Sequence, residues 1–216
     1  MTYLTEEMIQ QNKEAFIALI NSISRDGAKI EQLLTKLENS DFYTAPASTK
    51  YHSSFKGGLV YHCLNVYHNL MELVNMKGLN DEISTETIVI VSLLHDLSKM
   101  NFYQLSTRNK KVYSPQGKKQ DEIGKFDWVT EQSYATLPQE ERFMIGNHEE
   151  NSEYMARYFV PLTVEESAAI LNHHGGLGSD STQGVAPKIM GKFKLVTLLH
   201  LADMLAAYCD EEIKHE

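Results

Sequence analysis

The order of apolar and polar residues predicts a mostly helical chain. Apolar side chains recur three to four positions apart over residues 5–22 and again over residues 30–37, which is typical of amphipathic helices. The positions that carry this spacing are Met8, Ile9, Phe16, Ile17, Ile20, Ile30, Leu33, Leu34 and Leu37. A connector rich in turn-forming residues, with Pro46 and a Ser/Thr cluster, follows over residues 41–56.

Further helical patterns follow this connector. One helix is expected to begin near Gly57-Gly58 and to end at about Asn75. The next is expected to open at Ser84, which is a suitable N-terminal cap, and to end around His95. The remaining helices are expected at Pro138–Ile145, around Ser152–Phe159, at Thr163–Leu171 and from Lys192 to about Ile213.

Residues 102–129 break the helical pattern. They mix aromatic and β-branched residues with turn formers such as Pro115 and Gly117. We therefore expect a small β-hairpin or ordered loop inserted into an otherwise all-α domain that spans residues 1–216. No internal repeat or linker divides the chain.

Composition narrows the class of protein. With 216 residues, 42% hydrophobic and 23% charged, the chain fits one globular domain, and no apolar run approaches the roughly 20 residues of a membrane span. The polar N-terminal stretch and two cysteines without a CxxC pair favour a cytoplasmic protein. A formal charge of −9 argues against binding to duplex nucleic acid, but not against a small phosphorylated substrate, because bound metal would reverse the local field.

The pair His95-Asp96 is the first indication of chemistry. Neighbouring side chains on a helix diverge by about 100°, so two of them serve one small ligand only near a helix end. A divalent cation bound by an imidazole and a carboxylate is such a ligand. Taken alone, the pair also fits a capping aspartate beside an incidental core histidine.

The rest of the chain favours the metal. In order, the chain carries His62, His95-Asp96, His148, His173-His174 and Asp203. This ordered set, with the stretch HDLSK at residues 95–99, resembles the HD superfamily of metal-dependent phosphohydrolases, in particular small stand-alone members from bacteria and phages. The resemblance covers about residues 50–210, and residues 1–40 add N-terminal helices. It implies an HD-type helical bundle.

The resemblance also implies a ligand set. His62, His95, Asp96 and Asp203 would hold one ion. His148, His173 and His174 match the extra positions of members that hold a second ion, with Asp96 as the bridge. The expected cofactor is therefore a divalent transition metal, with two ions drawn from Mn, Fe, Ni, Co or Zn.

Further residues are expected to act on substrate. By the resemblance, Lys99 contacts a phosphate and acts in catalysis together with Asp96, although a solvated cation at a helix end is the alternative. His52 resembles a pocket residue of HD exoribonucleases, but Tyr51 stands where those carry another histidine. Lys118 and Lys119 lie in the insertion, which either covers the pocket or is an exposed hairpin.

Four histidine and acidic positions have two interpretations each. His200 either orients a ligand from one turn before Asp203 or is a plain helix residue. His68 falls on a different helix face from His62 and is expected to be structural or exposed. Glu149 and Glu150 either position water or form a solvated acidic turn.

These observations together predict a phosphohydrolase that cleaves a phosphate ester of a nucleotide or short oligonucleotide with metal-activated water. One alternative is a 3′-to-5′ exoribonuclease, although the strand-rich OB-fold of such enzymes has no counterpart here. A nucleotide-binding regulatory module without activity is less favoured, because the ligands that degenerate copies lose are all present. A di-iron oxygenase would use the same ligand set. The oligomeric state stays open.

Overall fold

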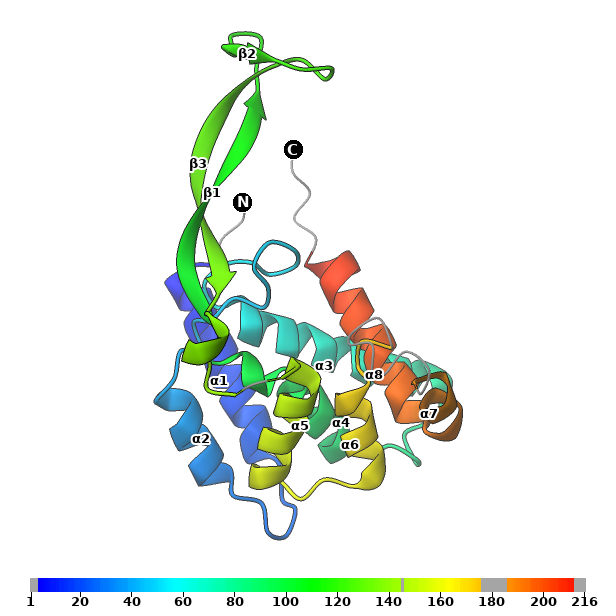
Figure 1. Cartoon of the computed structure of the whole chain (residues 1–216). Coiled ribbons are helices and arrows are strands. Elements are labelled where there is room, and N and C mark those ends of the chain that lie inside the picture. Colours follow the sequence, from blue (N-terminus) through cyan, green and yellow to red (C-terminus); the bar gives the residue numbers. More distant parts are fainter. Residues whose placement is uncertain (1–3, 145, 176–185, 212–216) are drawn as a thin grey trace.

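The computed structural model describes residues 4–211 except 145 and 176–185, and it is mostly helical with a three-stranded sheet (Figure 1). Its α-helices are α1 (Glu6–Asn21), α2 (Ile30–Glu38), α3 (Gly58–Lys77), α4 (Thr85–Leu94), α5 (His148–Phe159), α6 (Val164–Leu171), α7 (Ala186–Lys192) and α8 (Lys194–Leu205). Short turns of 3-10 helix occur at η1 (Leu97–Lys99) and η2 (Gln139–Glu141), and a π-helical turn, η3 (Ala206–Asp210), ends the described chain. None of the helices in the described ranges is long and apolar enough to cross a membrane.

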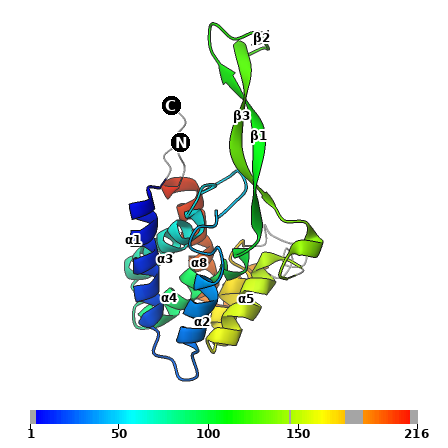
Figure 2. The same cartoon turned by 90° about the vertical axis from the view of Figure 1, so that its left-hand side faces the viewer.

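The N-terminal helices form where the apolar spacing predicts them. Thr5 caps α1 by accepting a hydrogen bond from the backbone N–H of Met8, and Ile9, Phe16 and Ile20 are the buried face of that helix. In α2, Leu33 and Leu37 are completely buried. Both helices lie at the edge of the bundle, and their buried residues belong to its core (Figure 2).

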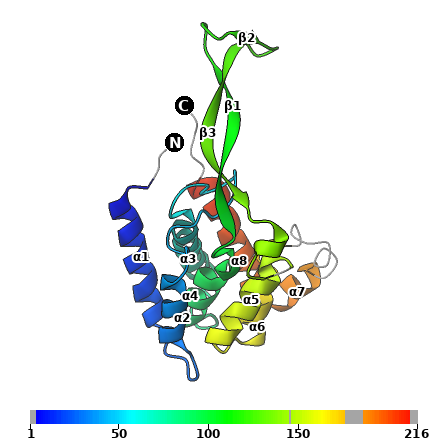
Figure 3. The ribbon, with the colours of Figure 1, turned by 60° about the vertical axis from the view of Figure 1, so that its left-hand side comes forward.

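Helix α4 is the centre of the bundle. All seven residues from Ile88 to Leu94 are buried, so this helix contacts protein on every side, including α1, α3, α5 and α6. Ser84 caps its first turn by accepting from the backbone N–H of Thr87. Figure 3 shows α4 among the other helices of the bundle. The residues that follow its C-terminal end, His95 and Asp96, are buried as well.

A partly buried ion-pair network connects three segments away from that end. Arg25, in the loop after α1, donates two hydrogen bonds to Glu166 on α6, at 2.6 and 2.9 Å, and two to Glu86 on α4. Glu166 also completes a capping box with Thr163 at the start of α6. One carboxylate therefore fixes the start of α6 and its position against α4.

The insertion is longer than the sequence predicts. Strands β1 (Tyr103–Tyr113) and β3 (Lys125–Thr136) pair as antiparallel neighbours along their full length, from Tyr103 opposite Thr136 to Tyr113 opposite Phe126. A short strand, β2 (Lys119–Gln120), adds to the far end of β3. We call residues 103–136 the arm, because the strands project well beyond the helices (Figures 1 and 2). The predicted end at residue 129 is wrong, since the polar residues 130–136 pair through their backbone and show no apolar signal.

Three predicted helix boundaries are also wrong. In place of a helix at Pro138–Ile145, the structure has only the turn η2, since the chain leaves β3 extended and Arg142 bonds back to the Leu137 carbonyl; Ile145 lies outside the described residues. Helix α5 begins at His148 rather than near Ser152, because Asn147 caps it. The helix expected from Lys192 begins at Lys194 as α8 and widens at η3, and its expected end, Ile213, lies outside the described residues. The short helix α7 before it is not predicted by the sequence.

Candidate metal centre

Four side chains from three helices converge at the buried end of α4. His62 comes from α3, His95 and Asp96 follow α4, and Asp203 comes from α8. Nε2 of His62 lies 3.3 Å from Nε2 of His95, 3.7 Å from Oδ2 of Asp96 and 3.1 Å from Oδ1 of Asp203. Nε2 of His95 lies 3.4 Å from Oδ2 of Asp96 and 3.9 Å from Oδ1 of Asp203. These four residues are the first cluster.

The spacing of these atoms suits a single cation. Ligand atoms at about 2.1 Å from a metal are about 3.0 Å apart at right angles and about 3.4 Å apart in a tetrahedron. The five distances in the first cluster, from 3.1 to 3.9 Å, lie around these values. Nitrogen and carboxylate oxygen are also the atoms that a divalent transition metal binds. The first cluster could hold a metal ion.

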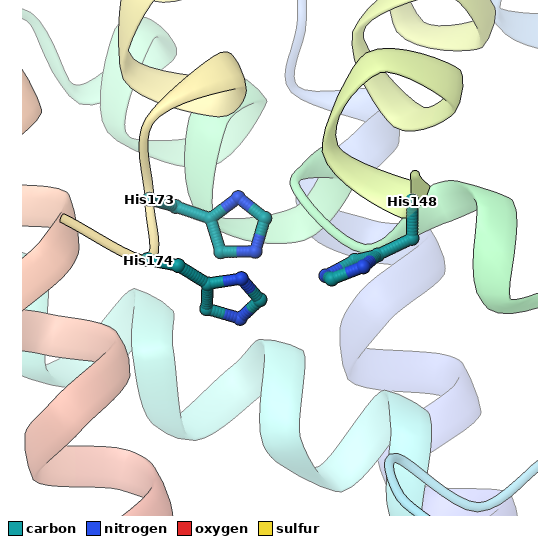
Figure 4. Close-up of side chains that lie close together, drawn as sticks. All are labelled: His148, His173 and His174. Atoms are coloured by element: carbon teal, nitrogen blue, oxygen red, sulfur yellow. The ribbon is translucent and has the colours of Figure 1, made fainter. Parts of the chain in front are cut away.

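Three further histidines form the second cluster on the other side of Asp96. His148 lies at the start of α5, while His173 and His174 follow α6, and the three rings face one another (Figure 4). Nε2 of His148 lies 3.6 Å and Nε2 of His173 lies 3.8 Å from Oδ1 of Asp96. The sequence predicts all of these residues as ligands, and the structure brings them together.

Unsatisfied polar atoms coincide at the second cluster. Oδ1 of Asp96, Nε2 of His148 and Nε2 of His173 are all buried, and none of the three has a hydrogen-bond partner. A buried polar atom without a partner costs about 1–3 kcal/mol, so three of them at one place need an explanation. A cation bound among them would satisfy all three. The second cluster therefore fits a metal ion on its own evidence.

The Nδ1 atoms determine which face each imidazole presents. His62 lies 2.9 Å from Glu211 Oε1, His95 2.8 Å from the Ser92 carbonyl, His173 2.7 Å from the Ile170 carbonyl, and His174 2.9 Å from Glu149 Oε1, all through Nδ1. Carbonyl and ionised carboxylate oxygens only accept, so Nδ1 must carry the proton in each ring. In His95, His173 and His174, Nε2 is then left with its lone pair, which is how metal-binding histidines are oriented in proteins. His62 also directs Nε2 to Asp203, at 3.1 Å, so this ring would have to release its second proton to bind a metal.

Glu211 is a residue of this site that the sequence does not point out. It is 4% exposed, and its carboxylate accepts from His62, His52 and Ser53, with Asn65 as a fourth donor. Nothing in the sequence marks a lone glutamate near a helix end, 149 positions from His62, as a partner of that histidine. Only the packing of η3 against α3 brings the two together.

Glu149 is the equivalent residue of the second cluster. It is 6% exposed, it binds His174, and its Oε2 lies 3.4 Å from Nδ1 of His148. The interpretation as a solvated acidic turn is therefore wrong for Glu149, because the start of α5 directs this side chain inward. Glu150, by contrast, is exposed.

Charge differs between the two clusters. Burial opposes a charge on His62, but Glu211 and Asp203 together raise its pKa to about 10. At the second cluster, burial and the nearby Lys99 ammonium lower the pKa of His148 to about 4, and burial together with His174 keeps the pKa of His173 well below its usual range. His148 and His173 are therefore neutral at physiological pH, and the neutral imidazole is the form that binds metals.

Lys99 lies inside the site. It is on η1, one turn after Asp96, and its Nζ donates to Asp96 Oδ2 at 2.7 Å. Burial opposes the ammonium charge, but Asp96 raises the pKa of Lys99 above its usual value. Only 9% of this residue is exposed, so the interpretation as a solvated cation is wrong.

The other predicted substrate residues lie in different places. His52 is half-buried beside the first cluster, with its ring centre 4.6 Å from that of His62. Lys118 and Lys119 are exposed, and they lie at the start of β2, which Figure 1 shows well away from the helices that carry both clusters. The structure therefore does not bring these two lysines to the site of their own chain, and the expectation that they bind substrate there is not supported by their position.

The other histidines and the cysteines lie outside the two clusters. His200 donates from Nδ1 to the His173 carbonyl at 2.7 Å, so it fixes backbone beside a ligand rather than the ligand side chain. His68, on α3, is exposed, as predicted. The thiol of Cys63 is buried in the core and that of Cys209 is exposed.

Two glycines lie where a side chain would collide with residues that support the clusters. Gly58, at the start of α3, has no room for a side chain, because a Cβ would collide with the Ser53 carbonyl, and Ser53 is one of the Glu211 donors. Gly175 follows the histidine pair with φ +62°, where a Cβ would collide with the ring of His200. A larger residue at either position would displace a partner of the clusters.

Comparisons with known proteins give no match to any family model, to any curated protein or to any solved structure. The HD-type bundle and HD family membership therefore stay predictions from the sequence. The finding about this site is the geometric one, that adjoining groups of buried and partly buried side chains could hold a metal ion. These groups are His62 with His95 and Asp96, the three histidines of the second cluster, and His62 with His52 and Glu211.

Proposed function

We propose that the protein is a metal-dependent phosphohydrolase of the HD type that cleaves a phosphate ester of a nucleotide or short oligonucleotide. The observation that carries the proposal is that three unsatisfied buried atoms, on Asp96, His148 and His173, lie together next to the first cluster. Buried polar atoms with a purely structural role are normally hydrogen-bonded within the protein.

The donor set supports two divalent ions. His62, His95, Asp96 and Asp203 would hold one, while His148, His173 and His174 with the free oxygen of Asp96 would hold the other. Imidazole with carboxylate favours Mn, Fe, Co, Ni or Zn over Mg and Ca. Such ions, when bound, lower the pKa of water and neutralise charge on a phosphoryl group.

The protein supplies the remaining functions. Asp96 faces both clusters through its two oxygens and so sets their separation. Lys99 holds a permanent positive charge next to Asp96 and is suited to bind a phosphate oxygen. Glu211 and Glu149 keep the imidazoles of His62 and His174 in the orientation and tautomer that present Nε2.

Other chemistries fit the same ligands less well. A di-iron oxygenase would use the two clusters, but the buried cation Lys99 favours a substrate with negative charge at the reacting group. A regulatory module without activity needs no intact pair of clusters, and the ligand residues of both are in place here.

The test is metal content combined with turnover. Elemental analysis of the purified protein should find up to two transition-metal ions per chain, and a panel of nucleotides, cyclic dinucleotides and short RNAs should release phosphate or mononucleotide with Mn²⁺, Fe²⁺, Co²⁺ or Ni²⁺. The variant Asp96→Ala should lose both metal and activity, whereas His68→Ala, an exposed histidine on the same helix as His62, should keep both. Metal and activity retained by Asp96→Ala would refute the proposal, and oxidation of a substrate without hydrolysis would assign the site to the oxygenase class.

A further inference from the structure

The two faces of the arm differ in character. Residues opposite each other in an antiparallel pair share a face, so Leu105, Lys111 and Tyr113 of β1 lie on the same side as Tyr134, Trp128 and Phe126 of β3. We call this side the aromatic face. The polar pairs Thr107 with Gln132 and Asn109 with Thr130 lie between its two ends. The opposite side carries the pairs Ser106 with Ser133, Arg108 with Glu131, Lys110 with Val129 and Val112 with Asp127.

Much of the aromatic face is open to solvent. The exposed fraction is 64% for Leu105, 49% for Trp128 and 41% for Tyr113. At the far end of the arm, the rings of Tyr113, Phe126 and Trp128 contact in sequence, with centres 5.6 and 5.7 Å apart. A two-stranded hairpin with no packed face is at best marginally stable in water, so a ribbon of this length needs a partner surface.

The distribution of charge over the chain indicates which partner surface the arm contacts. The arm carries six Lys or Arg and four Asp or Glu residues, a formal charge of +2, whereas the rest of the chain carries −11. The far end presents Lys118, Lys119 and Lys125 beside the exposed Glu122, and Asp121 there pairs with Lys111. The turn next to the base of the arm presents the exposed pair Glu140 and Glu141. A second copy of this chain supplies both the matching charge and a matching apolar face.

We propose that the arms of two copies of the chain pack against each other through their aromatic faces, in antiparallel orientation, to form a two-fold symmetric dimer. In this orientation the far end of one arm meets the base of the other, so the Tyr113 and Trp128 cluster covers Leu105, and the lysines approach Glu140 and Glu141. A parallel arrangement would instead place the lysine-rich ends together and the acidic bodies side by side. Identical contacts form twice, as two-fold symmetry requires.

The size of the contact sets the expected affinity. Eleven residues at about 3.3 Å each make a ribbon roughly 36 Å long, and about 10 Å of width gives a face on the order of 400 Å² per copy. The contacts between far end and base add to this, so the interface lies at the small end of specific interfaces. We expect a reversible dimer with a dissociation constant in the micromolar range.

Sedimentation velocity over a concentration series tests the dimer without any need for activity. The wild-type mass should rise toward two chains at tens of micromolar protein. Trp128→Ser combined with Leu105→Ser should leave monomer, while Val112→Ser combined with Val129→Ser, which alters the opposite face, should leave the dimer intact. A wild-type chain that is monomeric throughout, or equal loss of dimer in both double variants, would overturn the proposal. Unchanged circular dichroism confirms that each variant is folded.

Orientation has its own test. In a Cys209→Ser background, which removes the exposed native thiol, Lys118→Cys together with Glu140→Cys should form a disulfide between chains on mild oxidation. Lys118→Cys alone should give little, because antiparallel packing keeps the two arm ends apart; efficient crosslinking of that single variant would refute the orientation. If the arm of a monomeric wild-type chain binds a labelled single-stranded oligonucleotide and Trp128→Ser abolishes that binding, the aromatic face is a nucleic-acid surface and the dimer proposal fails.

Discussion

The Nδ1 atom of His62 lies 2.9 Å from Oε1 of Glu211, on the side of the ring opposite the other members of the first cluster. The same carboxylate accepts from His52 through its second oxygen. Glu211 therefore fixes the tautomer of His62 and orients its Nε2 toward Asp96 and Asp203.

Replacing this carboxylate tests its positioning role. We expect Glu211→Gln to weaken metal binding at the first cluster by about 10–100-fold, because a neutral amide no longer fixes the tautomer of His62 and no longer makes its Nε2 more basic. Competition with a chromophoric chelator measures the affinity. Asp210→Asn, the exposed neighbour that binds Asn69, is the matched control and should bind metal as the wild type does. Equal affinity in Glu211→Gln would remove Glu211 from the site.

Glu149 and Glu150 allow the same test at the second cluster. Glu149→Gln should weaken the second ion by about 10–100-fold and leave the first in place, because Glu149 contacts His174 and His148 but no member of the first cluster. Glu150→Gln changes an exposed side chain on the same turn and should have no effect. Metal stoichiometry after dialysis distinguishes the two outcomes, and loss of both ions in Glu149→Gln would contradict separate clusters.

The residues of the two clusters were predictable from sequence, and the carboxylates that support them were not. The ordered positions from His62 to Asp203 carry the resemblance to a family, and the structure brings them to one place. Glu211 follows no motif and meets His62 only because η3 packs on α3. Glu149 and Glu150 are the same residue type side by side, so only the start of α5 at His148 distinguishes the inward side chain from the outward one.

The fold shows a similar division. Helices with an apolar face, such as α1, α3 and α6, were predictable to within a few residues, because their buried residues recur at the spacing of one helix face. The second half of the arm was not, because residues 130–136 are mainly polar and are held as a strand by backbone pairing with β1. The acidic turn at Gln139–Glu141 favoured a helix by composition, but the chain enters it from an extended strand.

The Lys99 ammonium and a metal bound at Asp96 would compete for the same carboxylate oxygen. Removing the ammonium should therefore strengthen metal binding but weaken phosphate binding. Lys99→Met should strengthen metal binding by about tenfold, since the ammonium no longer occupies Oδ2, and should raise KM for a phosphate substrate. The metal-free variant should lose about 3 kcal/mol of stability, because Asp96 becomes a buried charge without its partner. Chelator competition and thermal unfolding with and without metal measure these effects. Lys99→Arg keeps the charge and should behave more like the wild type. Weaker metal binding in Lys99→Met would contradict the competition.

The network of Arg25 and Glu166 predicts an acid-dependent stability far from the metal ligands. Burial opposes ionisation of Glu166, but hydrogen bonds from Arg25, the Thr163 backbone and Thr87 outweigh it and keep its pKa below the usual 4.5. A carboxylate with a lowered pKa stabilises the fold above its unfolded pKa, and this contribution is lost as the pH falls through the folded pKa. The network should therefore contribute fully at neutral pH and weaken below about pH 4.5.

Glu166→Gln separates this contribution from the rest of the fold. At pH 7 the variant should unfold with about 3 kcal/mol less free energy than the wild type, because Arg25 keeps its charge at a partly buried position without a full partner. The difference should shrink as the pH is lowered, because wild-type Glu166 becomes protonated and resembles the glutamine. Urea unfolding at stepwise pH measures it. Lys194→Gln removes an exposed pair with Glu82 and should cost less than about 1 kcal/mol at any pH. A Glu166→Gln deficit that stays constant into the acid range would show that packing or the capping hydrogen bond, not the ion pair, stabilises this junction.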